Sequence, residues 1–223
     1  MNNSKAVLCG LIFLTSVGCG VAQNDNTNKT LKPKIIAYSD NICPFCYVGA
    51  KRIEKLKQEI DFDIEWRAFE IHPDTPKEGV ARSDYFGYNM DAAKTHLERF
   101  GKDVGMKMNN DTLANSHLSL KANEFAKKHN KQDEFHMAIF KAYFEEARNI
   151  GRIEVLLEIA ESVGLNKLEL KTYIESEEAE QAIEASSNEA RELGMTGVPT
   201  FIIGDAMIVG AQSYKVLKEA ITK

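Results

Sequence analysis

The chain has 223 residues, of which 43% are hydrophobic and 27% are charged, so it can bury the core of one large domain or two small ones. Its formal net charge is −5, and no stripe of lysine or arginine stands out, which argues against a nucleic-acid-binding protein. We find no repeat of fixed period and no low-complexity tract beyond a short polar linker.

The first 23 residues are predicted to be an export leader and not part of the fold. Lys5 supplies one positive charge, and residues 6–17 form a mostly apolar run that is too short to span a bilayer comfortably. Small residues up to Ala22 follow, where a signal peptidase would cut. The alternative is a buried N-terminal helix. A leader over 1–23 and a polar tether over 24–33 predict an extracytoplasmic protein of the bacterial periplasm.

Cys19 lies at the end of the apolar segment, where it resembles the lipid acceptor of bacterial lipoproteins, although one position of that motif does not match. Lipidation of Cys19, which would anchor the protein to the membrane, and cleavage after Ala22, which would release it, are both open. Either outcome leaves Cys43 and Cys46 as the only free thiol pair, because Cys9 is lost with the leader. We therefore expect no structural disulfide and no four-cysteine metal site.

Hydrophobic patterning predicts a β-α-β unit at the start of the fold. Residues 34–39 form a short apolar run typical of a central strand. A helix is expected to begin at Pro44, because proline is favoured at the first helical position. Residues 62–69 then alternate as a second strand. Two strands joined by a helix usually lie parallel.

The middle of the chain, from about residue 83 to residue 193, is predicted to contain helices and no strand. Aromatic and methionine residues there fall at helical spacings, and we expect them to form helix–helix core rather than a cofactor site. The predicted helices span residues 86–104, 116–129, 133–147, 153–163, 168–175 and 179–193.

A β-β-α unit is predicted at the end of the chain. Residues 200–203 and 206–209 read as strands, and the two residues between them, Gly204-Asp205, suit a tight hairpin. Residues 214–222 predict a closing helix. We expect the two units to share one sheet, with the helices inserted between them.

Cys43 and Cys46 form a C-x-x-C pair at the expected start of the first helix. Free backbone N–H groups and the helix dipole stabilise an anion there, and the thiolate is the attacking form of cysteine. We predict Cys43 as the exposed nucleophile and Cys46, one turn later and facing the core, as the resolving thiol. Zinc is not expected, because there is no second cysteine pair and the histidines show no tight paired spacing. These histidines are His72, His96, His117, His129 and His136.

A second signal is the stretch 197–201, in which Pro199 heads a predicted strand. A proline at that position denies the sheet ladder one N–H. In a sheet that ends beside the C-x-x-C helix, the loop before this strand is expected to face the cysteines.

Several stretches together resemble the thioredoxin superfamily, in particular its DsbA-like group and the FrnE-type dithiol–disulfide oxidoreductases. The resemblance implies an α/β thioredoxin fold, formed by residues 34–82 and 195–223, with a large all-helical insertion over 83–194. It also implies a redox-active Cys43–Cys46 disulfide without another cofactor, and substrates that are protein or peptide thiols and disulfides. The matching stretches are residues 42–49, 66–73, 142–144, 197–201 and 209–212.

The same resemblance implies that Val198–Pro199 is a cis peptide that packs against the active-site disulfide. X-Pro bonds are the ones in which the cis form costs little. Val198 and Pro199, together with Pro44 and Phe45 from the tetrapeptide, are then expected to contact an extended substrate segment.

Two departures from the family pattern moderate the expected chemistry. Phe45 stands where many members have tryptophan, and it lacks the imidazole that the strongest oxidants place between their cysteines. This suggests a milder oxidant or an isomerase. Ala37 stands where thioredoxin and DsbA carry a buried acid. Asp40 is the nearest acid and could relay a proton to Cys46, or it could simply cap the helix.

Three functions are therefore open. The first is thiol–disulfide exchange through a mixed disulfide at Cys43. The second is a glutathione-dependent enzyme that resembles 2-hydroxychromene-2-carboxylate isomerases and kappa-class glutathione transferases, which usually carry serine at the first catalytic position. The third is a non-catalytic lipoprotein that binds polypeptides through its helices.

Overall fold

The computed structural model describes residue 1 and residues 32–87 and 89–223, and Lys32–Lys223 form one compact unit. Apart from residue 1, the predicted leader, which includes the lipidation candidate Cys19, lies outside the described residues, as does nearly all of the predicted tether. No helix in the described part of the chain has both the length and the hydropathy needed to cross a bilayer.

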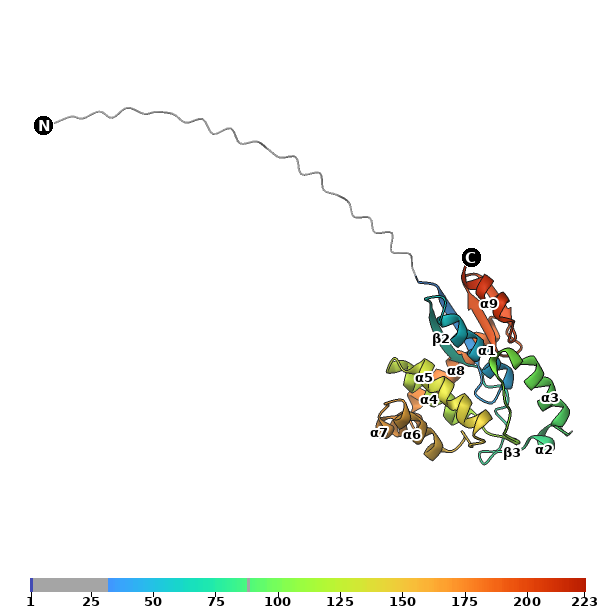
Figure 1. Cartoon of the computed structure of the whole chain (residues 1–223). Helices are drawn as coiled ribbons and strands as arrows, with labels where there is room; N and C mark the ends of the chain where they lie inside the picture. Colours follow the sequence, from blue (N-terminus) through green and yellow to red (C-terminus); the bar gives the residue numbers. More distant parts are fainter. Residues whose placement is uncertain (2–31, 88) are drawn as a thin grey trace. The chain divides into compact units, whose positions relative to one another are not determined.

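A four-stranded mixed sheet forms the centre of the fold, in the order β2-β1-β5-β6. β1 runs parallel to β2 and antiparallel to β5, which pairs antiparallel with β6. This confirms the predicted β-α-β and β-β-α units in one sheet (Figure 1). The elements are β1 (Lys34–Ser39), α1 (Pro44–Lys57), β2 (Asp63–Ala68), β5 (Thr200–Ile203), β6 (Ala206–Val209) and α9 (Tyr214–Ile221).

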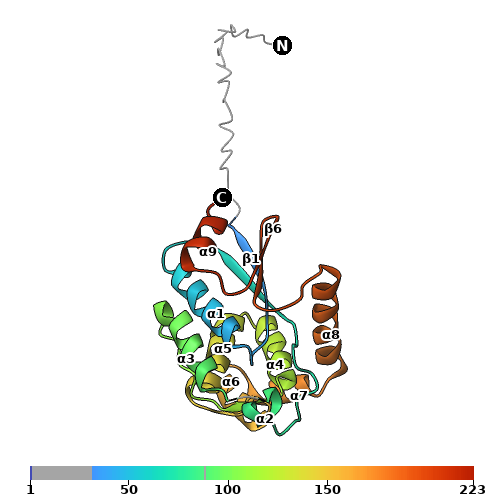
Figure 2. The ribbon, with the colours of Figure 1, turned by 90° about the vertical axis from the view of Figure 1, so that its right-hand side faces the viewer.

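Helices cover both faces of the sheet. Figure 2 shows α1 and α9 on one side and α8 (Glu177–Glu192) on the other. Side chains of β1 alternate accordingly, because successive residues of a strand point to opposite faces. Ile35 and Ala37 belong to the main core, whereas Tyr38 packs with Ala190 and Met195 on the side of α8.

The segment between β2 and β5 is mainly helical, and most of it gathers at the end of the sheet towards which β1 runs (Figures 1 and 2). Several of its aromatic residues are fully buried, as expected for helix–helix core; they are Phe135, Phe140, Tyr143 and Phe144. Besides α8, the helices are α2 (Arg82–Phe86), α3 (Asp91–Phe100), η1 (Lys102–Val104), α4 (His117–Lys128), α5 (Gln132–Phe140), the π-helical η2 (Lys141–Glu145), α6 (Ile153–Ser162) and α7 (Lys167–Ile174).

Two predictions about this segment are wrong. The expected helix 86–104 is broken, because Gly87 adopts a left-handed conformation with φ of 74° that ends α2. The segment also contains a strand, β4 (Thr112–Leu113), which pairs antiparallel with β3 (Val80–Ala81). A strand of two residues is too short to produce a detectable alternation in the sequence.

His117 joins three parts of the fold at the start of α4. Its Nδ1 lies 3.2 Å from Glu70 Oε2, just after β2, and its Nε2 lies 3.1 Å from Glu180 Oε2 on α8. The bond with Glu70 raises the pKa of His117 most, burial opposes the rise, and Glu180 adds to it. The imidazolium form is thus stabilised in the folded protein.

We expect His117→Gln to lower stability by roughly 0.5–1 kcal/mol at pH 5.5, as for a partly exposed ion pair. Because the folded-state pKa of His117 is raised, its contribution is fully present below the ordinary histidine pKa of about 6.5. It is lost as the pH rises through the raised pKa. Urea unfolding of both proteins between pH 5.5 and 8.5 measures this. A stability difference that grows with pH would contradict the assignment.

Candidate active site

The N-terminus of α1 is built by a short turn after β1. The backbone N–H of Cys43 donates to the Asp40 carbonyl at 3.1 Å, which closes the turn. Cys43 is the N-cap residue, with extended dihedral angles and no side-chain cap, and Pro44 follows at the first helical position. The Cys43 carbonyl accepts from Cys46 N–H at 3.1 Å. Both thiols therefore belong to the first turn of a helix of 14 residues.

Cys43 and Cys46 are free thiols and both are buried. The expectation that Cys43 is exposed is wrong: it is only 5% exposed, because the loop before β5 lies over it and Cys43 Sγ donates to the Val198 carbonyl at 3.7 Å. Phe45 is the exposed member of the tetrapeptide, at 38%. Cys46 is fully buried, and burial, followed by the neighbouring Cys43, raises the pKa of its thiol.

The Val198–Pro199 peptide is cis, and hydrogen bonds on either side fix its loop. The Pro199 carbonyl accepts from Gly210 N–H at 2.7 Å, and Thr200 Oγ1 donates to the Gly197 carbonyl at 2.8 Å. Because Cys43 Sγ donates to the Val198 carbonyl, the predicted contact between this loop and the cysteines is present in the structure.

Gly49 allows α1 to pack closely against the same loop. A Cβ atom at this position would lie 3.1 Å from Phe201 Cζ and 3.3 Å from Pro199 Cγ, which is tighter than ordinary packing. The absence of a side chain at Gly49 therefore helps to bring the first turns of α1 against β5 and Pro199.

A family model described as a DSBA-like thioredoxin domain matches residues 34–222. The chain belongs to this DsbA-like family. The uncharacterized protein YwbO of Bacillus subtilis is 32% identical to it over 192 residues, which cover 84% of this chain and 95% of the relative.

Two solved structures show how the DsbA-like fold recurs. A probable DsbA oxidoreductase from Streptomyces coelicolor is 25% identical, with a TM-score of 0.77, and the match covers 85% of this chain and 88% of the other. A 2-hydroxychromene-2-carboxylate isomerase is 21% identical, with a TM-score of 0.72 and coverage of 85% and 94%. The second likeness shows the fold alone.

The helical insertion of this DsbA-like chain contributes to the rim of the site. Phe100, at the end of α3, packs edge-on against Phe45 with 5.4 Å between ring centroids. Phe100 is 39% exposed, and the Cζ atom of the Arg52 guanidinium lies 5.0 Å from the centroid of the Phe100 ring. This role could not be predicted, because Phe100 lies within a predicted helix whose position relative to the cysteines was unknown.

Asp40 is fully buried beside the site, and burial raises the pKa of its carboxyl to about 6. The carboxylate accepts from Ile71 N–H at 2.8 Å and from Ile42 N–H at 3.2 Å. Neither amide belongs to α1, so the expected alternative of a helix cap is wrong. The effect of Asp40 on Cys46 comes from its backbone, which partly opposes the rise in the Cys46 pKa. Ala37 occupies the position at which thioredoxin and DsbA carry a buried acid. It is fully buried, and its side chain has no polar group.

The sequence interpretation missed two buried polar residues beside the site. The Ser39 side chain partly opposes the rise in the Cys46 pKa that burial causes, and Ser39 Oγ lies 3.3 Å from His136 Nε2 on α5. A spacing of four residues from Gln132 to His136 to Phe140 could have indicated that His136 faces inward.

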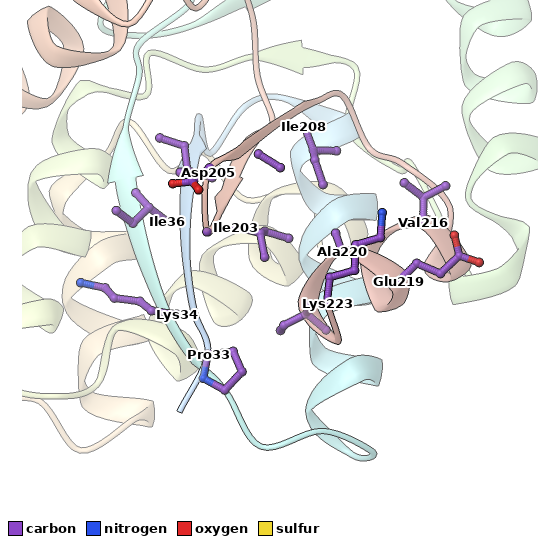
Figure 3. A pocket seen from close by; sticks show the side chains of 14 residues that line it. Pro33, Lys34, Ile36, Ile203, Asp205, Ile208, Val216, Glu219, Ala220 and Lys223 are labelled. Atoms are coloured by element: carbon purple, nitrogen blue, oxygen red, sulfur yellow. The ribbon is translucent and has the colours of Figure 1, made fainter. Parts of the chain in front are cut away.

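A groove of about 960 Å³ lies away from the cysteines. Figure 3 shows apolar side chains of β1, β5, β6 and α9 around it, among them Ile36, Ile203 and Ile208. Pro33 and Lys34, which line it, lie at the start of β1, whereas the cysteines follow the end of β1. The groove is therefore at the opposite end of the sheet. Residues 32–87 and 89–223 contain no group of three acidic, histidine or cysteine side chains that could hold a metal.

Proposed function

We propose that the protein is an exported thiol–disulfide oxidoreductase of FrnE type that exchanges disulfides with protein substrates through Cys43. One observation carries the proposal: two free thiols occupy the first turn of α1, and the outer one contacts the loop that contains the cis proline. Family membership supports thiol–disulfide chemistry in general.

In the reductive direction, Cys43 thiolate attacks a substrate disulfide. The substrate S–S bond breaks, a Cys43–substrate disulfide forms, and the departing substrate sulfur takes a proton from water. Cys46, as a thiolate, then attacks Cys43 Sγ. The second substrate sulfur leaves as a thiolate, and Cys43–Cys46 becomes the disulfide. Two electrons pass to the substrate, and oxidation of a substrate dithiol is the reverse sequence.

The substrate segment is proposed to lie across Val198 and Pro199 on one side and Pro44 and Phe45 on the other. Phe45 offers an exposed apolar ring and no imidazole, which supports a mild oxidant or an isomerase. Asp40 remains a candidate proton relay, since its pKa of about 6 allows it to exchange a proton near neutral pH. A periplasmic location, with or without a lipid on Cys19, completes the proposal.

A glutathione-dependent isomerase is the second candidate, supported by the fold shared with a 2-hydroxychromene-2-carboxylate isomerase. The paired thiols favour disulfide exchange. A second thiol such as Cys46 has a role in disulfide exchange, but the glutathione-dependent isomerisation does not need one. A polypeptide-binding lipoprotein without redox activity is the third.

Equilibration of purified residues 24–223 in glutathione buffers of defined ratio tests the three candidates. We expect a single two-electron couple at Cys43 and Cys46, read by alkylation and mass spectrometry, together with insulin reduction and refolding of scrambled ribonuclease. Glutathione-dependent turnover of 2-hydroxychromene-2-carboxylate without insulin reduction would favour the second candidate. Absence of any redox couple would favour the third.

A further inference from the structure

Arg82 is a buried arginine that has no carboxylate partner in the described part of the chain. It begins α2 and is 3% exposed. The guanidinium of arginine stays protonated inside proteins, so its burial leaves a full positive charge in the core. Arg52, which is buried to a similar degree, forms an ion pair with Asp103. Because an unpaired buried charge lowers stability, Arg82 is a candidate for a role in function.

The polar contacts of Arg82 do not neutralise its charge. Nη2 donates to Tyr143 Oη at 2.7 Å, and Tyr143 Oη in turn donates to the Thr112 carbonyl at 2.8 Å. Burial raises the pKa of Tyr143, which therefore stays an uncharged phenol. Arg82 Nε is buried without a hydrogen-bond partner among the described residues. The cation is thus held in place by a neutral hydroxyl.

A second contact places this charge beside the turn that carries the thiols. Arg82 Nη2 lies 3.5 Å from the Ile42 carbonyl oxygen, which is a long hydrogen-bond distance. That carbonyl belongs to the peptide bond between Ile42 and Cys43, so Nη2 is at most roughly 9 Å from Cys43 Sγ in any rotamer of Cys43. Cys43 and Cys46 are 5% and 0% exposed. Water and salt therefore screen the attraction between the guanidinium and a thiolate only weakly.

Other titratable side chains near this turn are Asp40 and His72. Asp40 is buried, and its carboxylate accepts from two backbone N–H groups. An ionised Asp40 opposes the effect of Arg82 on a thiolate, so the variants described below leave Asp40 intact. Burial lowers the pKa of His72, Asp74 raises it and Arg82 lowers it further, which leaves the imidazole neutral at pH 7.

We propose that Arg82 raises the reduction potential of the Cys43–Cys46 pair by stabilising the thiolate of its reduced form. The inference rests on the proposed function. In the disulfide the sulfurs carry no charge, so the guanidinium favours the reduced form and makes the disulfide a stronger oxidant. Arg82 thereby supplies part of the stabilisation that an imidazole between the cysteines would provide and that Phe45 does not.

Equilibration with glutathione measures this effect in the purified protein, residues 24–223. Oxidation of the pair passes two electrons to glutathione disulfide, and the two glutathione molecules that are released carry away the two thiol protons. We expect Arg82→Gln to shift this equilibrium about 3- to 10-fold towards the Cys43–Cys46 disulfide at pH 7, because one weakly screened charge is lost. Alkylation and mass spectrometry give the oxidised fraction.

Three further variants separate the charge of Arg82 from its structural role. Arg82→Lys removes the planar fork and Tyr143→Phe removes the hydroxyl, but both keep a cation. Both should lower stability and leave the glutathione equilibrium within about 2-fold of the parent. Arg67→Gln is the matched control: it also removes one positive charge, but this charge is already paired with Glu65 and Glu189. It should leave the equilibrium within about 2-fold as well.

The pH dependence of the first attack is a second readout. The probe is 4,4′-dithiodipyridine, an uncharged disulfide whose approach does not depend on the cation. At pH 6, reduced Arg82→Gln should react about 2- to 3-fold more slowly than the parent, because less of its nucleophile is ionised. The order should reverse at high pH, where both proteins are ionised and the more basic thiolate is the more nucleophilic. A purely structural loss would not reverse.

An unchanged glutathione equilibrium in folded Arg82→Gln would overturn the inference. Equal shifts in Arg82→Gln and Tyr143→Phe would also overturn it, because the charge would then not be the cause. Should Arg82→Gln not fold, Arg82→Met removes the same charge and carries the same test. Absence of a Cys43–Cys46 redox couple in the parent would instead overturn the proposed function.

Discussion

Replacement of Cys43 by serine is expected to abolish disulfide exchange, with insulin reduction falling by on the order of 10³-fold or more. A serine hydroxyl is not ionised at neutral pH and cannot form the mixed disulfide. The fold should survive, because serine is close to cysteine in size and Cys43 makes one weak side-chain hydrogen bond, to Val198. Insulin turbidity measures the activity, and urea unfolding checks the stability.

Cys46→Ala is the matched variant, and it should fail in a different way. The first attack still occurs, so a covalent complex between Cys43 and the substrate accumulates and appears on non-reducing gels and by mass spectrometry. Cys43→Ser should give no such complex. If the trapped substrate is instead found on Cys46 in Cys43→Ser, the assignment of the two thiols is reversed.

Arg52→Ala is expected to lower the free energy of unfolding by about 3 kcal/mol. Arg52 is 5% exposed and holds together three separate segments. Its Nε and Nη2 donate to the Asp103 carboxylate at 2.9 and 2.7 Å. Its other bonds reach the carbonyls of Phe100, Ala211 and Gln212 at 3.0, 2.7 and 3.1 Å. Alanine would leave these acceptors without their donor.

Midpoints of urea unfolding for three variants of α1 test this prediction. Arg52→Lys keeps the charge but not the planar fork, so an intermediate loss is expected. Lys55→Ala removes an exposed cation from the same helix and should cost under about 1 kcal/mol. A loss in Arg52→Ala no larger than in Lys55→Ala would show that the buried network contributes little to stability.

The parts of the fold that could be predicted are those specified by local sequence. β1 and the start of α1 match their predicted bounds, because a short apolar run and a proline at the first helical position act over a few residues. The two hairpin strands β5 and β6 also match, since a two-residue turn separates them. The candidate thiols and the proline loop were found because each carries a local motif.

The parts that could not be predicted depend on contacts between distant residues. Burial of Cys43 arises from a loop 155 positions later in the chain, and Ser39 meets His136 across 97 positions. Neither Ser39 nor His136 belongs to a motif, and only the spacing of His136 from Gln132 and Phe140 could have indicated that His136 faces inward. The pairing of β3 with β4 was missed for another reason: each strand has only two residues, too few for a detectable alternation.

The contact between Phe45 and Phe100 joins the helix that carries the thiols to the helical insertion. Phe45 comes with the thiols on α1, whereas Phe100 comes from the helical insertion. Under the proposed function, an exchange of the insertion for that of another member would alter which polypeptides dock beside Cys43 and leave the thiols in place. Substrate preference could then diverge between relatives, or be engineered, without a change in the redox couple.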